Sequence, residues 1–352
     1  MDYLSETPIP SQLIKIIGEI DEFKGRWATL GNLAPERLSV LKHIATIESV
    51  GSSTRIEGVK LTDDEIEVLL SGLDITSFNS RDEEEVAGYA DLMEMIHESH
   101  TDIPLNENTI QQLHGVLLKY SGKDERHRGQ YKKLPNHVEA FDATGNSVGV
   151  IFETATPFDT PRLMADLVSW TDLAMTEHAH HSLLVISVFV VRFLAIHPFQ
   201  DGNGRLSRAL TTLLLLRAGY RYVSYGSLER IIEDSKEEYY KALRRAQSTL
   251  DKGEDQLVDW LAFFLNTMLR QKRILEGKIK QENLMAPLAP LSEQLLEIAR
   301  GHGRVTVREA AAATGANRNT IKDHLSKLVN AGYLVRRGQG RGAWYEKSTA
   351  GL

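Results

Sequence analysis

The sequence predicts a mainly α-helical protein that carries one β-hairpin and ends in a winged helix-turn-helix. Apolar residues recur at three-and-four spacing along most of residues 11–278, which is typical of helices that bury one face. The pattern fails between residues 121 and 157, where turn residues separate two short stretches with strand character. Residues 291–352 follow a helix and strand order of their own, which indicates a separate small domain.

The N-terminal region is predicted to be a set of helices. Amphipathic patterns occur at residues 13–27, 33–50, 61–70 and 83–100. Two stretches rich in Gly and Ser, Gly51-Ser52-Ser53 and Ser71-Gly72, predict breaks after the second and third of these helices. This region, residues 1–104, is expected to precede the core as a helical unit.

The central region, residues 105–278, is predicted to be helical around one hairpin. The hairpin is expected at residues 129–152, with its turn at 142–146. Helical patterns are found at residues 108–120, 160–177, 182–196, 205–218, 236–250 and 256–278.

The tail is predicted to be a winged helix-turn-helix, residues 291–352, joined by a linker at 279–290 that contains Pro287 and Pro290. Its expected elements are helices at 292–300, 308–314 and 318–331 and strands at 304–307, 333–337 and 343–346. The tail carries a net charge of +5 and the rest of the chain −12, so the tail is the part suited to nucleic acid.

Composition excludes several classes of protein. The chain of 352 residues has no cysteine, which rules out disulfides, thiolate metal sites, iron–sulfur clusters and a cysteine nucleophile. Its start carries acidic residues and no apolar stretch follows, so no secretory signal is expected. The longest apolar run, residues 183–196, is short for a membrane crossing of about 20 residues. We therefore expect a cytoplasmic protein with no membrane partner.

The string HPFQDGNGRLSR at residues 197–208 combines a base with an anion-binding turn. Pro198 disfavours helical backbone at the residue before it, so His197 is expected at a helix end that faces a loop. Gly202 and Gly204 allow main-chain N–H groups to approach an anion closely. The following helix points its positive end at the same loop, which favours phosphate there.

Three charged side chains complete this predicted phosphate site. Arg205 and Arg208 are three residues apart on a helix, and their guanidinium groups match phosphate oxygens. Asp201 offers the oxygen ligand that Mg²⁺ prefers beside phosphates. An EF-hand is excluded because Arg205 and Thr212 stand where calcium needs oxygen ligands, and no Gly-Lys-Ser/Thr follows a glycine as in a P-loop. An ordinary DGNG turn would leave the base and both arginines unexplained.

The string resembles the HPFxxGNGRxxR signature of the Fic family, whose members mostly transfer AMP from ATP to a protein hydroxyl. The resemblance extends over residues 105–270, through the apolar helix at 182–196 and the Tyr239-Tyr240 pair. It implies a Fic helical core with a flap β-hairpin. It also implies an ATP- and Mg²⁺-dependent protein adenylyltransferase that modifies Ser, Thr or Tyr of a target protein or of itself.

The resemblance implies a role for each matching residue. His197 would be the general base that takes the proton of the target hydroxyl, and Asp201 would hold Mg²⁺ against the phosphates. Arg205 and Arg208 would hold the β- and γ-phosphates, and Asn203 with the loop amides the α-phosphate. The implied ATP-binding set is Gly202, Asn203, Gly204, Arg205, Arg208, Tyr239 and Tyr240. A relative that phosphorylates has lysine at the position of Gly204, so glycine here favours AMP transfer.

A second motif lies upstream. Residues 53–58, STRIEG, match the family's inhibitory pattern [S/T]xxxE[G/N], with Ser53, Glu57 and Gly58 at its fixed positions. The resemblance implies that Glu57 pairs with Arg208, removes one phosphate ligand and autoinhibits the enzyme. In some relatives the same glutamate serves the removal of AMP. The alternative is that Ser53 caps a helix and Glu57 is solvated.

Outside these motifs the sequence indicates less. His97 and His100 are three residues apart, one short of the HExxH zinc spacing, and His114 has the character of an ordinary helix residue. The residues expected to be exposed on a DNA recognition helix are Arg318, Asn319, Lys322, His324 and Lys327. Winged helices also serve as docking or dimerisation modules, so a homodimer stays open. Three rival functions also stay open: removal of AMP, transfer of another nucleotide, and a DNA-binding regulator whose Fic core senses a nucleotide.

Overall fold

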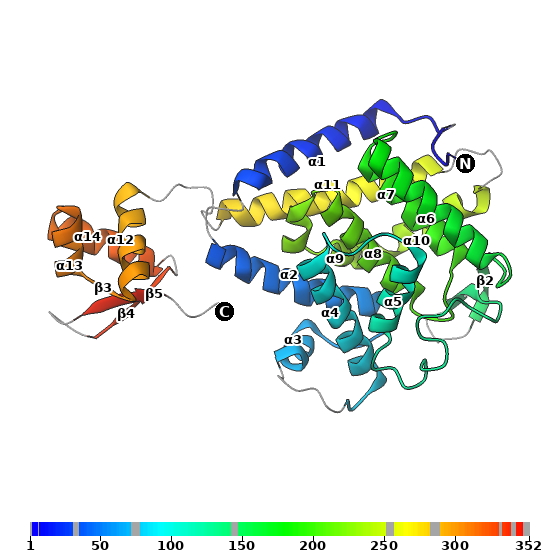
Figure 1. Cartoon of the computed structure of the whole chain (residues 1–352), viewed down its shortest axis with the longest axis horizontal. Helices are drawn as coiled ribbons and strands as arrows, with labels where there is room; N and C mark the ends of the chain where they lie inside the picture. The colour runs from blue at the N-terminus through cyan, green and yellow to red at the C-terminus, as the bar shows by residue number, and fades with distance from the viewer. Residues whose placement is uncertain are drawn as a thin grey trace. The chain divides into compact units, whose positions relative to one another are not determined.

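The computed structural model confirms a mainly α-helical chain (Figure 1). It describes residues 2–5, 7–30, 35–71, 78–141, 147–250, 257–281, 289–330, 333–338 and 343–347. Packing divides the chain into two compact units, residues 1–28 with 42–276 and residues 29–41 with 277–352.

Helices make up most of the described chain before residue 282. They are α1 (Ser11–Leu30), α2 (Pro35–Ile56), α3 (Asp63–Ser71), α4 (Arg81–Ser99), α5 (Glu107–Leu117), α6 (Thr160–Glu177), α7 (Ser182–Ile196), α8 (Asn203–Arg217), the 3₁₀ helix η1 (Arg221–Tyr225), α9 (Leu228–Asp234), α10 (Lys236–Thr249) and α11 (Leu257–Gln281). The sequence patterns did not predict η1 and α9.

The core of the first unit is built around α7. This helix is apolar on every side, which is typical of a helix surrounded by others, and it packs against α6, α8 and α10 (Figure 1). The next helix, α8, is buried along nearly its whole length. The loop between them, residues 197–202, is therefore fixed at both ends by the core. No helix in the described ranges is long and apolar enough to cross a membrane.

The predicted hairpin is present, although it begins later than expected. Strands β1 (His137–Phe141) and β2 (Ser147–Glu153) pair antiparallel, with His137 opposite Glu153 and Phe141 opposite Ser147. Residues 129–131, expected to belong to the first strand, lie before it, and Gly129 is part of a turn. The predicted turn at residues 142–146 lies outside the described residues.

The predicted helix break at Gly51-Ser52-Ser53 is wrong, because α2 continues to Ile56. Ser52 and Ser53 are completely buried, so the packing of this segment holds it helical against its weak local propensity. Gly51 has a packing role: a Cβ there would lie 2.7 Å from Nη1 of Arg55. The serines therefore face the protein interior instead of capping a helix.

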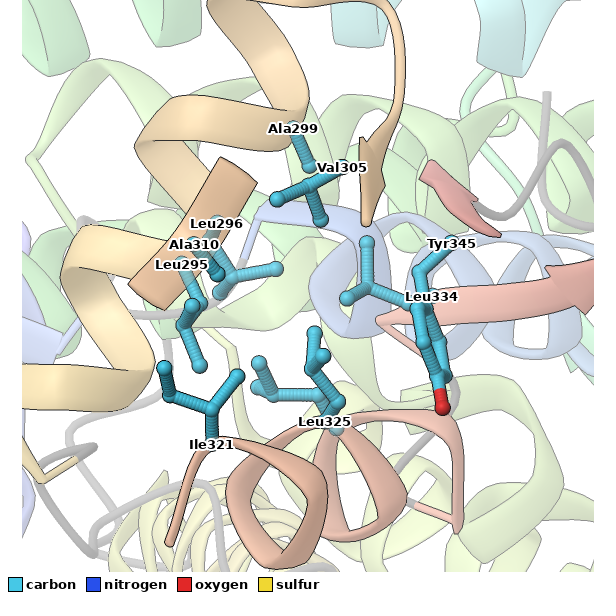
Figure 2. Close-up of a cluster of buried hydrophobic side chains, with 10 residues drawn as sticks. Leu295, Leu296, Ala299, Val305, Ala310, Ile321, Leu325, Leu334 and Tyr345 are labelled. Atoms are coloured by element: carbon cyan, nitrogen blue, oxygen red, sulfur yellow. The ribbon is translucent and has the colours of Figure 1, made fainter. Parts of the chain in front are cut away.

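The second unit contains the predicted winged helix-turn-helix. Its elements are α12 (Pro290–His302), β3 (Val305–Thr306), α13 (Val307–Thr314), α14 (Arg318–Asn330), β4 (Leu334–Arg337) and β5 (Trp344–Lys347), with strand order β3-β5-β4. Figure 2 shows side chains from its helices, among them Leu295, Ile321 and Leu325, converging with Leu334 on one small core. The predicted linker residues 282–288 and the wing residues 339–342 lie outside the described residues.

Candidate active site

His197 lies where α7 ends, as the sequence predicted. Its backbone is left-handed, with φ 52° and ψ 60°, and its N–H donates to the carbonyl oxygen of Phe193 at 2.9 Å. Ring atom Nδ1 lies 3.3 Å from the carbonyl oxygen of Leu194. Because a carbonyl can only accept, Nδ1 carries the hydrogen, and Nε2 keeps a lone pair that can take a proton.

The loop after His197 packs on the side chain of His114. The prediction that His114 is an ordinary helix residue was therefore wrong. The His114 ring is fully buried and stacks on Phe199 with centroids 3.9 Å apart. Its Nδ1 accepts from the N–H of Gly129 at 2.9 Å, so Nε2 donates to the carbonyl oxygen of Asp201 at 3.0 Å. Burial lowers the pKa of His114 to about 4, which keeps this arrangement neutral.

Asn203 closes the loop internally. Its side-chain oxygen accepts from the N–H of Phe199 at 2.9 Å, and its Nδ2 donates to the carbonyl oxygen of Phe199 at 2.8 Å. Both polar atoms of the Asn203 side chain thus bind main-chain atoms of the loop. These bonds make Asn203 a residue that shapes the loop, and the α-phosphate contact that the resemblance implied stays a prediction.

The predicted nucleotide residues line one pocket of about 180 Å³. The pocket is lined by Glu57, Leu194, His197, Gln200, Asp201, Gly202, Asn203, Gly204, Arg205, Arg208, Tyr239, Tyr240, Leu243, Arg244 and Gln247. Gly202 is the residue before α8 and has a φ of 79°, which favours glycine. The N-terminus of α8 therefore opens into the pocket, and its free N–H groups favour an anion.

The ion pair predicted between Glu57 and Arg208 is present. Arg208 Nη2 lies 2.7 Å from Glu57 Oε1, and the Arg208 side chain is 5% exposed. Arg208 also donates from Nε to the hydroxyl oxygen of Ser53 and from Nη2 to its carbonyl oxygen, both at 2.8 Å. Gly58 turns the chain directly after Glu57 with a φ of 108°. All three residues of the upstream motif thus help to place one carboxylate.

The Glu57 carboxylate lies beside Gly204, in the first turn of α8. A Cβ at Gly204 would lie 2.1 Å from Glu57 Oε1, so a side chain larger than glycine's hydrogen would displace the carboxylate. Burial alone would raise the pKa of Glu57, but the charge and hydrogen bond of Arg208 outweigh burial and lower it. Glu57 is therefore ionised and presents negative charge at the N-terminus of α8.

The segment that carries Glu57 is fixed by a second set of contacts. Arg55 Nε pairs with Glu233 of α9 at 2.7 Å, and its Nη1 pairs with Asp63 at 2.9 Å. Lys236 of α10 donates to the carbonyl oxygen of Ile56 at 2.8 Å. The end of α2 is thus tied to α9 and α10 independently of Glu57.

Asp201 is the carboxylate that suits Mg²⁺ in this loop. Its side chain is 34% exposed and faces the pocket. The described residues contain no cluster of three or more His, Cys, Asp or Glu side chains that could hold a metal by themselves. Mg²⁺ that accompanies phosphates needs only one or two protein carboxylates, so Asp201 fits that mode.

Two charged residues of α4 contact Arg205 of α8 and Asp201 of the loop. Neither was predicted from the sequence. Glu85 Oε2 lies 2.8 Å from Arg205 Nη1, and the Arg205 side chain is only 3% exposed. Arg81 Nη2 lies 3.4 Å from Asp201 Oδ2. Their partners are 120 residues away along the chain, and no local pattern marks them.

In the winged helix-turn-helix, four predicted residues of α14 are exposed: Arg318, Asn319, Lys322 and Lys327. His324 is different, because its ring is half-buried and its Nδ1 lies 2.8 Å from the hydroxyl oxygen of Ser292 in α12. The expectation that His324 belongs to the exposed face is therefore wrong. It joins two helices of the domain.

The two parts of the chain match two different family models. Residues 104–215 match the model of the Fic/DOC family, and this range includes α7, the loop that contains His197, and α8 as far as Leu215. The chain contains a Fic domain. Residues 288–335 match a winged helix-turn-helix DNA-binding model, in agreement with the fold of the second unit.

Relatives of the Fic domain occur in distant organisms. A Fido domain-containing protein of Dictyostelium discoideum is 40% identical over 63 residues, 18% of this chain and 40% of the relative. A probable protein adenylyltransferase of Aquifex aeolicus is 30% identical over 99 residues, 28% of each chain. The chain thus spans less than half the length of these curated relatives. The crystal structure of a Fic family protein from Desulfovibrio desulfuricans shares the fold with a TM-score of 0.61, 22% identity and 98% coverage of both chains.

His197 of the Fic domain is expected to stay neutral at a pH where an exposed histidine would be protonated. Burial lowers the pKa of His197 to about 4, below its ordinary value of about 6.5, so the neutral form that can accept a proton persists down to about pH 5. Nuclear magnetic resonance of ¹⁵N-histidine-labelled protein, with His197→Gln to assign the signal, should give a midpoint below pH 5. The denatured chain supplies the solvated reference. A midpoint near pH 6.5 for His197 in the folded protein would contradict the burial effect.

Proposed function

We propose that the Fic domain is a protein adenylyltransferase that transfers AMP from ATP to a Ser, Thr or Tyr hydroxyl of a target protein or of itself. One pocket brings together a proton acceptor, a helix N-terminus and two arginines, and this observation carries the proposal. His197, Gly204, Arg205 and Arg208 all line it. The similarity to named adenylyltransferases supports the same activity.

In the proposed reaction the target hydroxyl oxygen attacks the α-phosphorus of ATP. The bond from that phosphorus to the bridging oxygen breaks, pyrophosphate leaves, and the hydroxyl proton passes to Nε2 of His197. Asp201 would hold Mg²⁺, which supplies positive charge against the phosphates. Arg205 and Arg208 would hold the β- and γ-phosphates, and the N-terminus of α8 stabilises charge that develops on the α-phosphate.

We also propose that Glu57 autoinhibits this reaction. Its carboxylate uses the Arg208 group that would bind the γ-phosphate, and it places negative charge beside Gly204, where phosphate would lie. Like charges at this separation repel, so ATP would bind in an unproductive orientation. Movement of the Glu57 side chain would free Arg208 from the carboxylate while α2 stays bound through Arg55.

Replacement of Glu57 tests the function and its inhibition together. Glu57→Gly should raise the transfer of label from [α-³²P]ATP to protein at least tenfold, which corresponds to about 1.4 kcal/mol of transition-state stabilisation. Adding His197→Ala to this variant should abolish labelling, because the proton acceptor is lost.

The controls for this experiment separate the rival activities. [γ-³²P]ATP should label nothing, and label from the γ position would indicate phosphoryl transfer instead. Equal rates for wild type and Glu57→Gly would contradict inhibition. If Glu57→Gly abolished release of AMP from a modified protein, Glu57 would be a participant in AMP removal.

We propose DNA binding as a second function, because the exposed positive residues of α14 lie in a domain that matches DNA-binding winged helices. Phosphate neutralisation releases counterions, so binding should weaken as salt rises. In a gel-shift assay with duplex DNA at low salt, Arg318→Ala and Lys322→Ala in the full chain should weaken binding. Lys15→Ala, an exposed change in α1, is the matched control. Equal binding by all variants would reject α14 as the helix that contacts DNA, and no shift at low salt would favour a docking role for the domain.

A further inference from the structure

Helix α4 precedes the residues that match the Fic family, yet two of its side chains contact Arg205 and Asp201, which line the pocket. Glu85 lies between two arginines: Oε1 is 2.7 Å from Arg81 Nε, and Oε2 is 2.8 Å from Arg205 Nη1. Asp201 also lies between two arginines, with Arg205 Nη2 and Arg81 Nη2 each at 3.4 Å. The four side chains form a closed ring of alternating charge.

The position of α4 is tightly constrained. A Cβ at Gly88 would lie 2.1 Å from the carbonyl oxygen of Leu117, so the backbones of α4 and α5 are in direct contact. Ser80 caps α4 by accepting from the N–H of Glu83 at 3.2 Å, and Asp82 accepts from the N–H of Lys60 at 2.9 Å. Glu85 and Arg81 therefore extend from a fixed base.

The members of the ring differ in their freedom to move. The side chains of Arg205 and Glu85 are 3% and 10% exposed, whereas that of Arg81 is 49% exposed. The planar guanidinium group of Arg81 moves as a unit, and its contact with Glu85 at 2.7 Å is shorter than its contact with Asp201 at 3.4 Å. Arg81 is thus the member that can leave Asp201 at little cost.

We propose that Arg81 is a tethered cation that competes with Mg²⁺ for Asp201. The inference rests on the proposed nucleotide site, in which Asp201 is the metal ligand. Arg81 balances the negative charge of the Asp201 carboxylate through a long contact. When Mg²⁺ enters with the nucleotide phosphates, Arg81 moves away from Asp201 and keeps its bond to Glu85. Its charge opposes that of the metal, so the contact sets how strongly Mg²⁺ and nucleotide support each other's binding.

Calorimetric titration of ADP with and without Mg²⁺ tests this competition without any turnover. The measured quantity is the factor by which Mg²⁺ strengthens ADP binding. Arg81→Gln removes the competing charge and should increase this factor at least threefold over wild type. Arg81→Lys keeps the charge and should stay close to wild type. Arg162→Gln, a 65% exposed arginine of α6 that pairs with Asp166, is the matched control and should change nothing.

The outcomes separate this inference from the proposed function. An unchanged or smaller Mg²⁺ factor in Arg81→Gln, with ADP still bound, would overturn the competition and leave the nucleotide site intact. Equal increases in Arg81→Gln and Arg81→Lys would also overturn it, because charge would not be the cause. Failure of wild type to bind ADP at all would reject the nucleotide site and this inference with it.

Discussion

Arg208 lies in the interior of the first unit, and a buried guanidinium group is stable only where carboxylates or several acceptors surround it. Here those acceptors come from the end of α2, through Glu57 and both oxygens of Ser53. The contacts of Arg208 in α8 thereby help to hold the end of α2 in place, together with the ion pairs of Arg55 and the bond from Lys236. The same contact explains how the upstream motif reaches the nucleotide pocket.

The other charged groups of the loop follow the same principle. Arg205 is as buried as Arg208 and is balanced by Glu85 of α4, and Asp201 is balanced by Arg81 and Arg205. Each of the two arginines proposed to bind phosphate is thus matched by a carboxylate from outside residues 104–215. The charged groups proposed to bind a nucleotide are therefore already paired within the protein.

Local patterns predicted what is contiguous in the sequence, whereas the contact between the distant residues Glu57 and Arg208 was predicted only from the family resemblance. The apolar run of α7, the hairpin and the elements of the tail follow from local patterns, and the string at residues 197–208 contains its base, turn and arginines side by side. His114 and Glu85 could not be predicted, because their partners lie 87 and 120 residues away. The false helix break at Gly51 has the opposite cause, since packing overrides a correct local signal.

The central claim is that Glu57 occupies the place of the γ-phosphate. The most direct measurement compares ATP with ADP affinity by calorimetry with Mg²⁺ present, in a His197→Ala background that prevents turnover. If Glu57 holds Arg208, that protein should bind ATP no more tightly than ADP, because the γ-phosphate meets a carboxylate. Adding Glu57→Gly should shift the preference toward ATP at least tenfold, or about 1.4 kcal/mol. The same ATP-to-ADP ratio in both proteins would contradict the claim.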